Sequence, residues 1–128
     1  MNAGRDAIRI LAVDDHPMFR ERLAALLGTQ ADMIVVAEAS NGREAIQQFR
    51  QHQPDITLLD LQMPEMNGRD AMVAIRNEFP EAKIIILATY RSDVQGAMKM
   101  GARAFLLKTQ SDMELLGTIR AVQGRPEN

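Results

Sequence analysis

The strongest constraint on the fold is an apolar run that ends on a single acid. Residues 56–60 read Ile-Thr-Leu-Leu-Asp, and a loop with proline, asparagine and glycine follows over residues 61–68. A nearly continuous apolar run is typical of a parallel strand covered on both faces. A buried charge is costly, so Asp60 is expected where the strand reaches the sheet edge. Ligands bind at the carboxyl edge of open α/β sheets, which makes Asp60 a candidate for chemistry as well as for a turn.

Four further strand-like runs alternate with helix-like segments. The other strands are expected over residues 8–13, 33–37, 83–88 and 104–107. The helices are expected over 17–27, after the caps Asn41 and Asn67, over 92–100, and after the cap Ser111. Five repeats of strand then helix call for right-handed crossovers and a parallel sheet. The predicted fold class is a doubly wound α/β sandwich with helices on both faces.

Length and composition indicate one compact domain. The chain has 128 residues, no cysteine and a net charge of −2, and its basic residues are scattered. The sequence therefore contains no disulfide, and no basic face favours direct binding of nucleic acid or membrane. No signal peptide is recognisable at the polar start, so a cytoplasmic location is expected. The folded core is expected over residues 7–123, with 1–6 and 124–128 outside it.

Acidic residues follow two of the expected strands. Asp14 and Asp15 end the first strand and Asp60 ends the third, while Thr89 and Lys108 follow the fourth and fifth. Taken alone, Asp60 and Thr89 are better explained as turn residues, and Lys108 is explained equally well as a strand-end ion pair. If the first and third strands are neighbours, however, their three acids form one cluster whose repulsion requires a cation. Carboxylate oxygens suit Mg²⁺, so the sequence predicts a magnesium site.

The turn after the first strand excludes other phosphate sites. Residues 14–17 (DDHP) stand where a dinucleotide or Walker-type site needs a glycine-rich turn. Pro17 suits the first turn of a helix. His16, just before it, is interpreted as a capping or packing residue without a chemical role.

Three ordered motifs carry a family resemblance. Residues 13–17 (VDDHP), 59–68 (LDLQMPEMNG) and 101–108 (GARAFLLK) resemble the receiver domains of two-component response regulators. The resemblance covers nearly the whole chain, and the DDHP and FLLK forms are most similar to the NarL/FixJ (LuxR-type) branch. It implies a flavodoxin-like (CheY-like) fold, with five parallel strands in the order 2-1-3-4-5.

The same resemblance implies a role for each residue at the predicted edge. Asp60 is expected to be the phosphoacceptor. Asp14 and Asp15 are expected to hold Mg²⁺ together with Asp60 and the backbone carbonyl of Gln62. Lys108 is expected to pair with the phosphoryl group. These roles agree with phosphoryl transfer by positioning and electrostatics.

Partners follow from the resemblance as well. A sensor histidine kinase is the expected phosphoryl donor, and phosphorylation is expected to promote a homodimer. Residues 124–128 are expected to begin a linker to a C-terminal helix-turn-helix domain, through which alone the protein would contact DNA. No membrane partner is expected. The chain is expected to act as a switch rather than as an enzyme.

The sequence departs from the family pattern beside the site. Ala88 stands where the family's switch hydroxyl falls, so the switch is expected to involve Ala88, Thr89 and Tyr90, and residues 88–101 are about two positions short. Lys108 precedes Thr109 in place of the proline of many receivers, and a cis bond is not expected there. These departures leave a phosphorylation-independent (pseudo-receiver) interaction module as the alternative function. A Mg²⁺-dependent phosphohydrolase is disfavoured, because Gln62 replaces the second acid of its motif.

Overall fold

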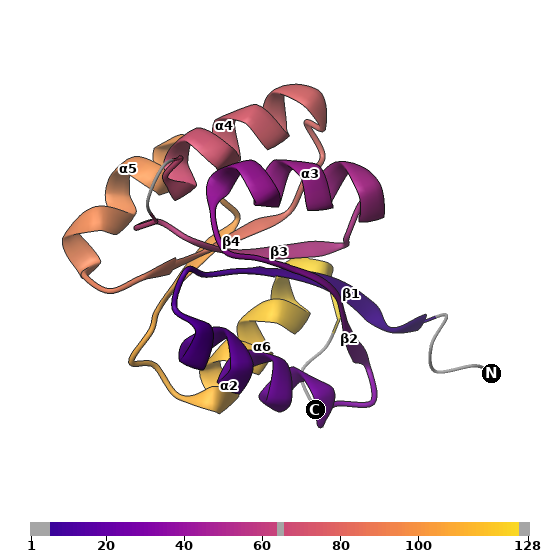
Figure 1. Cartoon of the computed structure of the whole chain (residues 1–128). Helices are drawn as coiled ribbons and strands as arrows, with labels where there is room; N and C mark the ends of the chain where they lie inside the picture. The colour runs from indigo at the N-terminus through magenta and orange to yellow at the C-terminus, as the bar shows by residue number, and fades with distance from the viewer. Residues whose placement is uncertain (1–5, 64–65, 126–128) are drawn as a thin grey trace.

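The computed structural model describes residues 6–63 and 66–125, and it contains one parallel sheet between two layers of helices (Figure 1). The five strands lie in the order β2-β1-β3-β4-β5, which confirms the predicted doubly wound fold. Their bounds are Ile8–Val13 for β1, Met33–Ala39 for β2, Ile56–Asp60 for β3, Ile84–Ala88 for β4 and Ala104–Leu107 for β5.

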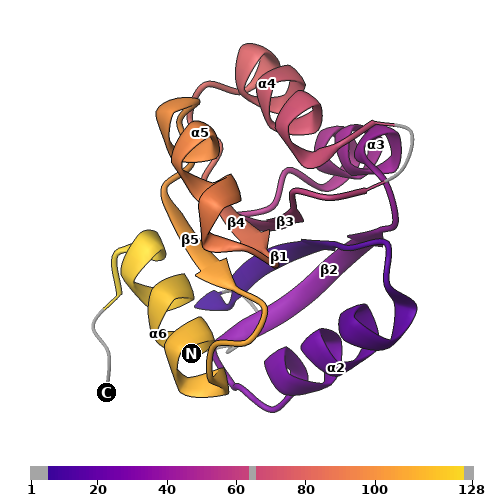
Figure 2. The same ribbon diagram turned by 90° about the vertical axis from the view of Figure 1, so that its left-hand side faces the viewer.

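The helices divide between the two faces of the sheet. Helices α2 and α6 cover one face, and α3, α4 and α5 cover the other (Figures 1 and 2). Their bounds are Pro17–Gly28 for α2, Gly42–His52 for α3, Gly68–Glu78 for α4, Val94–Lys99 for α5 and Asp112–Gln123 for α6, with a 3₁₀ turn η1 at Arg91–Asp93.

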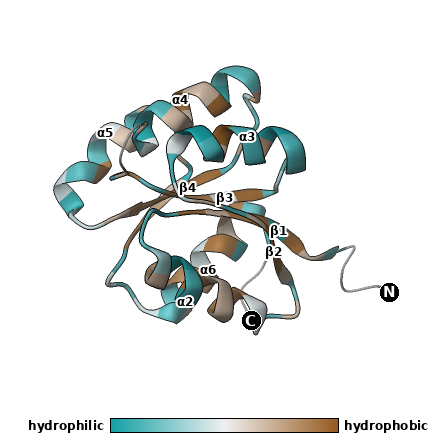
Figure 3. Cartoon of the chain, viewed as in Figure 1, coloured by the Kyte–Doolittle hydropathy of each residue, from teal (hydrophilic) through white to brown (hydrophobic). Residues whose placement is uncertain are grey.

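Two apolar layers fill the space between the sheet and the helices. Every residue of β3 and β4 is buried, as expected of central parallel strands. Figure 3 shows that the strands of the sheet are largely hydrophobic. Alternate residues point to opposite faces: Leu59 and Ile86 pack in the layer under α3, α4 and α5, whereas Leu58 and Ile85 pack in the layer under α2 and α6. Both faces of the sheet are therefore packed against helices, and this packing holds the carboxyl ends of the strands in place.

The predicted N-caps are confirmed. The side chains of Asn41, Asn67 and Ser111 each accept a hydrogen bond from the backbone N–H three residues later, at 2.8, 2.9 and 3.2 Å. These bonds satisfy N–H groups that have no partner within the helix. One detail differs, since the Glu44 carboxylate accepts the N–H of Ser40 at 2.9 Å instead of the N–H of its cap residue.

The segment before β5 differs from the single helix expected over 92–100. It consists of the three-residue turn η1 and the six-residue helix α5, and no side chain caps either of them. The Asp93 N–H bonds to the Tyr90 carbonyl at 3.1 Å, which is the tighter 3₁₀ pattern. Gly101, with a φ of +107°, reverses the chain after the helix. The described residues contain no cis peptide bond, so Lys108–Thr109 is trans as expected.

Part of the predicted tails falls outside the described residues, namely 1–5 and 126–128. Within the expected linker, Gly124 caps α6 with a φ of +86°. None of the described helices has the length and apolar character needed to cross a membrane.

Candidate functional site

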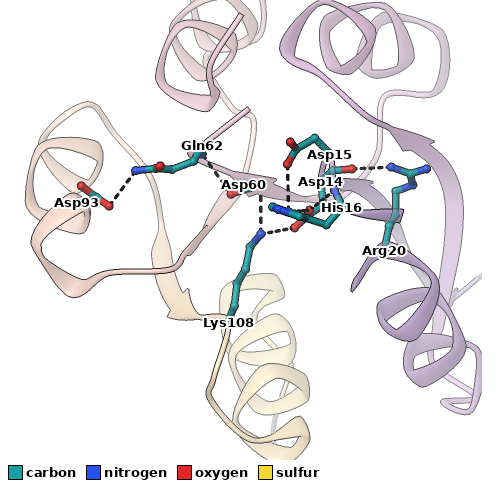
Figure 4. A network of polar contacts seen from close by, with 8 residues as sticks. All are labelled: Asp14, Asp15, His16, Arg20, Asp60, Gln62, Asp93 and Lys108. Atoms are coloured by element: carbon teal, nitrogen blue, oxygen red, sulfur yellow. Dashed lines mark hydrogen bonds and ion pairs between the residues drawn. The ribbon is translucent and has the colours of Figure 1, made fainter. Parts of the chain in front are cut away.

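The sheet topology brings the predicted site residues to one edge. Val13 on β1 lies opposite Leu59 on β3, so Asp14 and Asp60 are the next residues on two adjacent strands. Lys108 follows the last residue of β5 at the same edge. Figure 4 shows these side chains pointing toward one another. The spatial convergence predicted for the acids and the lysine is confirmed.

Lys108 joins two buried acids. Its Nζ lies 2.7 Å from Oδ2 of Asp14 and 3.2 Å from Oδ2 of Asp60. The acid side chains are 0% and 1% exposed, and that of Lys108 is 14% exposed. The ammonium also lies 4.9 Å from the centre of the Phe19 ring, within range of a cation–π contact. One cation thus serves two carboxylates in a nearly dry environment.

Burial and charge act on Asp60 in the same direction. Burial, then the neighbouring Asp14 charge, raises the pKa of Asp60 from 3.8 to about 6, although Lys108 and the Gln62 N–H partly oppose the rise. For Lys108, burial lowers the pKa, but the hydrogen bond from its ammonium to Asp14 and the charge of Asp60 outweigh burial, so the pKa is raised. Near neutral pH Asp60 is therefore mostly an ionised carboxylate beside a cation.

The acid cluster, Asp14, Asp15 and Asp60, suits a divalent cation. One oxygen or ring nitrogen from each acid and from His16 lies within 4.8 Å of all the others. Apart from ion-pair contacts to Lys108 or His16, a buried oxygen of each acid accepts no hydrogen bond. Oxygen donors with spare capacity are the ligands that Mg²⁺ prefers. The donor set therefore fits the expected ion.

A hollow of about 600 Å³ lies beside the acid cluster, and of the three acids Asp15 lines it. Asp15, Gln62, Arg69 and Asp93 are among the residues that line it. Its lining comes from both the loop after β3 and η1. The sequence motifs did not indicate that these two segments lie together.

The sequence interpretation of His16 as a capping or packing residue holds for its position but not for its side chain. The residue is at the N-cap position of α2, but its side chain makes no cap hydrogen bond and is 65% exposed. Its Nδ1 instead lies 3.1 Å from Oδ1 of Asp14 and 3.2 Å from Oδ1 of Asp15. Its N–H donates to Oδ1 of Asp14 at 2.8 Å, an Asx turn that the adjacency of Asp14 and His16 could have suggested.

Arg20 is a second residue that sequence reasoning missed. Its Nη1 donates to the backbone carbonyl of Asp14 at 2.5 Å, and its Nε donates to Glu38 at 3.1 Å. Arg20 therefore links α2 and β2 to the loop that carries the acids. The only sequence signal was a basic residue one turn into the helix.

Gln62 connects Asp60 with a segment that is distant in the sequence. Its N–H donates to Oδ1 of Asp60 at 3.1 Å, and its side-chain amide donates to Oδ2 of Asp93 at 3.1 Å (Figure 4). The predicted role of its backbone carbonyl as a metal ligand stays a prediction.

The expected switch residues do not converge on the acids. Ala88 is buried at the end of β4, where its carbonyl accepts the N–H of Lys108 at 2.9 Å. The Thr89 side chain is exposed and makes no hydrogen bond to any described residue, and Tyr90 is 63% exposed. A hydroxyl is therefore absent from the buried side-chain position that ends β4.

Comparison with known proteins agrees with the geometry. The family model "Response regulator receiver domain" matches residues 10–120. The chain belongs to the response-regulator receiver family. Response regulator protein VraR of Staphylococcus aureus is 36% identical over 115 residues, which are 88% of this chain and 55% of that protein. The chain thus spans about half the length of the curated relatives that it matches.

Solved structures support the same branch of the family. A LuxR-family two-component response regulator from Aurantimonas sp. SI85-9A1 has a TM-score of 0.88 and 34% identity, over 93% of this receiver and 87% of that chain. A LuxR-family DNA-binding response regulator from Staphylococcus aureus has a TM-score of 0.85 and 27% identity, over 91% of this receiver and 99% of that chain. These relatives place the receiver in the NarL/FixJ (LuxR-type) branch.

Proposed function

We propose that Asp60 accepts a phosphoryl group from the phosphohistidine of a sensor kinase. The observation that carries the proposal is the buried Asp60 carboxylate, which shares one cation, Lys108, with Asp14. In the transfer, a carboxylate oxygen of Asp60 forms a bond to phosphorus while the phosphorus–nitrogen bond breaks. The bonding pair stays on the imidazole, which takes up a proton from water, and the product is an acyl phosphate on Asp60.

Mg²⁺ is the cofactor of the proposed reaction. Asp14, Asp15, Asp60 and the carbonyl of Gln62 would hold the ion, which neutralises charge on the phosphoryl oxygens when bound. Lys108 already lies 3.2 Å from an oxygen of Asp60, so a phosphoryl group on this side chain is within its reach. Lys108 then holds a phosphoryl oxygen and orients the group for in-line attack.

The output of the proposed switch is control of transcription in the cytoplasm. Its support is the membership of the LuxR-type branch and the greater length of the curated relatives. One solved relative is also described as a DNA-binding response regulator. In this proposal a phosphorylated homodimer acts through a separate helix-turn-helix domain. The receiver itself contacts neither DNA nor membrane and turns over no substrate.

Intact-mass measurement tests the proposal directly. The purified chain is incubated with a small acyl phosphate, with and without Mg²⁺, and it should gain the mass of one phosphoryl group only with the ion. Asp60→Asn should abolish the gain. Asp55→Asn is the matched control, because Asp55 lies just before the same strand and accepts a backbone hydrogen bond from Arg9. A gain that persists in Asp60→Asn overturns the assignment.

The buried Ala88 favours one other candidate, a phosphorylation-independent interaction module. Without a hydroxyl at this position, modification of Asp60 has no side-chain donor on β4 to attract. Sedimentation and amide exchange before and after confirmed phosphorylation separate the two functions. Unchanged association and unchanged exchange across residues 88–108 would favour the interaction module.

A further inference from the structure

Two side chains from the neighbourhood of the site converge on Asp93. The Gln62 amide donates to Oδ2 of Asp93 at 3.1 Å, and Nη2 of Arg69 donates to the Asp93 carbonyl at 3.3 Å. Asp93 ends η1 and directly precedes α5. The start of α5 is therefore tied to the loop after β3 and to the first turn of α4.

The other end of α5 is also held by α4. Nη1 of Arg76 donates to the carbonyl of Met100 at 3.1 Å, and a Cβ on Gly101 would lie 2.1 Å from the same nitrogen. Arg69 and Arg76 are seven residues apart, so they project from one face of α4. The residues that flank α5 at both ends are therefore hydrogen-bonded to arginines of α4.

The loop after β3 is packed closely against the end of that strand. A Cβ on Gly68 would lie 2.2 Å from the carbonyl oxygen of Asp60, and the Gly68 N–H donates to the Leu61 carbonyl at 3.0 Å. The N–H of Gln62 faces Oδ1 of Asp60 at 3.1 Å. A new bond or charge on the Asp60 carboxylate therefore acts directly on the backbone of Gln62.

Strand β4 offers no equivalent route from the site. Ala88 has no polar side-chain atom, and the exposed Thr89 hydroxyl makes no hydrogen bond to the described residues. Within the described chain, a path of side-chain hydrogen bonds runs from Asp60 through Gln62 to Asp93, in the segment before β5.

We propose that Asp93 is a positioning residue for the phosphoacceptor site, acting through Gln62, and that the Gln62–Asp93 contact couples the site to α5. A fixed Gln62 side chain holds the N–H on Asp60 and the carbonyl offered to the metal. Because coupling is reciprocal, a change at the site must in turn alter the hold on Asp93. The phosphoryl part of this coupling rests on the proposed function, whereas the divalent-ion part can be measured without phosphorylation.

A double-mutant cycle on the intact chain tests the positioning role. Mg²⁺ dissociation constants are measured by calorimetry for the unchanged chain, Asp93→Ala, Gln62→Ala and the double variant. Each single variant should weaken Mg²⁺ binding by about two- to tenfold. The double variant should bind no more weakly than either single one, because both changes remove the same contact. Additive losses of Mg²⁺ affinity would show that Asp93 acts only as a distant negative charge, and they would overturn the proposal.

Two further variants separate the contact from charge and from folding. Asp93→Asn keeps an oxygen that can accept from Gln62 and should restore most of the Mg²⁺ affinity. Glu81→Ala removes one exposed acid just before β4, at the opposite end of the sheet, and should leave the affinity unchanged. Equal losses in Asp93→Asn and Asp93→Ala would overturn the proposal. Melting temperatures confirm that each variant is folded.

Amide exchange over residues 91–100 tests the coupling. In the unchanged chain, Mg²⁺ alone should slow exchange in this segment, and phosphorylation should change it again. In Asp93→Ala the ion should still bind at saturating concentration, but the segment should not respond. A full response in Asp93→Ala overturns the coupling. If the unchanged chain takes up no phosphoryl group, the proposed function fails, and the response to Mg²⁺ still decides the role of Asp93.

Discussion

The two ends of the sheet each hold an aspartate paired with a cation, and the pairs differ in their electrostatics. At the amino end, Asp32 lies 2.8 Å from Nε of Arg120, and that hydrogen bond lowers the pKa of Asp32 despite partial burial. At the carboxyl end, Asp60 lies 3.2 Å from Nζ of Lys108, yet burial and the charge of Asp14 raise its pKa to about 6.

The two pairs differ in the number of acids that share a cation and in the solvent exposure of those acids. Arg120 makes two hydrogen bonds to the Asp32 carboxylate, which is 35% exposed. Lys108 serves two acids that are almost fully buried. The Asp32–Arg120 pair stabilises the fold. The two acids at Lys108 keep an excess negative charge, which a bound metal ion would neutralise and which is available for a phosphoryl reaction. Paired charges alone therefore do not identify a stabilising site.

The largest expected effect is on phosphoryl transfer. Lys108→Met removes the cation that faces the reacting group, and the transfer rate should fall by about 10²- to 10³-fold, as for the loss of one preorganised charge-stabilising donor. Arg120→Met removes the cation at the other end of the sheet and should leave the rate unchanged. Single-turnover phosphorylation monitored by intact mass measures both rates. Equal rates in the two variants would remove Lys108 from the reaction.

The second effect is on stability without divalent ions. Asp60→Asn removes a buried charge whose pKa is raised from 3.8 to about 6, so it should stabilise the chain at neutral pH by roughly 3 kcal/mol. Asp32→Asn should instead destabilise it, because the charged form of Asp32 is the stabilised one. Urea unfolding in a chelator measures both changes. Destabilisation by Asp60→Asn would contradict the raised pKa.

The pH dependence gives the sign of the Asp60 effect. Because the folded chain binds a proton on Asp60 more tightly than the unfolded chain does, this group's contribution is fully present below about pH 4 and is lost as the pH rises through about 6. The unchanged chain should therefore lose stability relative to Asp60→Asn across this interval. Parallel stability curves for the two proteins would exclude the effect.

The third effect is the stabilisation of the fold by Mg²⁺, which reduces the repulsion between the carboxylates of the acid cluster. At an ion concentration 100 times the dissociation constant, binding should stabilise the fold by about 2.7 kcal/mol, and the melting temperature should rise accordingly. Asp15→Ala removes one proposed ligand and should shrink the rise markedly. Asp32→Ala is the control at the other end of the sheet and should retain it. An equal rise in the unchanged chain and Asp15→Ala would exclude Asp15 as a ligand.

The smallest effect belongs to the amino-end pair. Arg120→Ala should lower the free energy of unfolding by about 1 kcal/mol, the upper range for a partly exposed ion pair with good geometry. Because the pKa of Asp32 is lowered in the folded chain, this deficit should shrink as the pH falls through the folded-state pKa of Asp32. The hydrogen bond from Arg120 to Gln30, at 2.8 Å, does not titrate and accounts for what remains. Thermal unfolding at neutral and acidic pH measures the change. A deficit that does not shrink at low pH would show that the Asp32 charge contributes nothing.

The sequence by itself determined the fold class and the residues of the carboxyl edge. Periodicity and capping are local properties: the apolar run ending at Asp60 and the Asn67 cap can be recognised within a few residues. Parallel connectivity then sends every strand's carboxyl end to the same edge. That rule places Asp14, Asp60 and Lys108 at one edge, and the strand order implied by the family resemblance makes them neighbours.

Only the tertiary structure decided how those residues are supported. The contact between Gln62 and Asp93 joins residues 31 positions apart, and it exists because α4 and α5 pack side by side on one face of the sheet. The His16 ring turned to the acids, and the raised pKa of Asp60, likewise depend on burial and on neighbours from other elements. Local patterns encode backbone preference and polarity, whereas hydrogen-bond partners and electrostatic fields depend on the distances that packing sets.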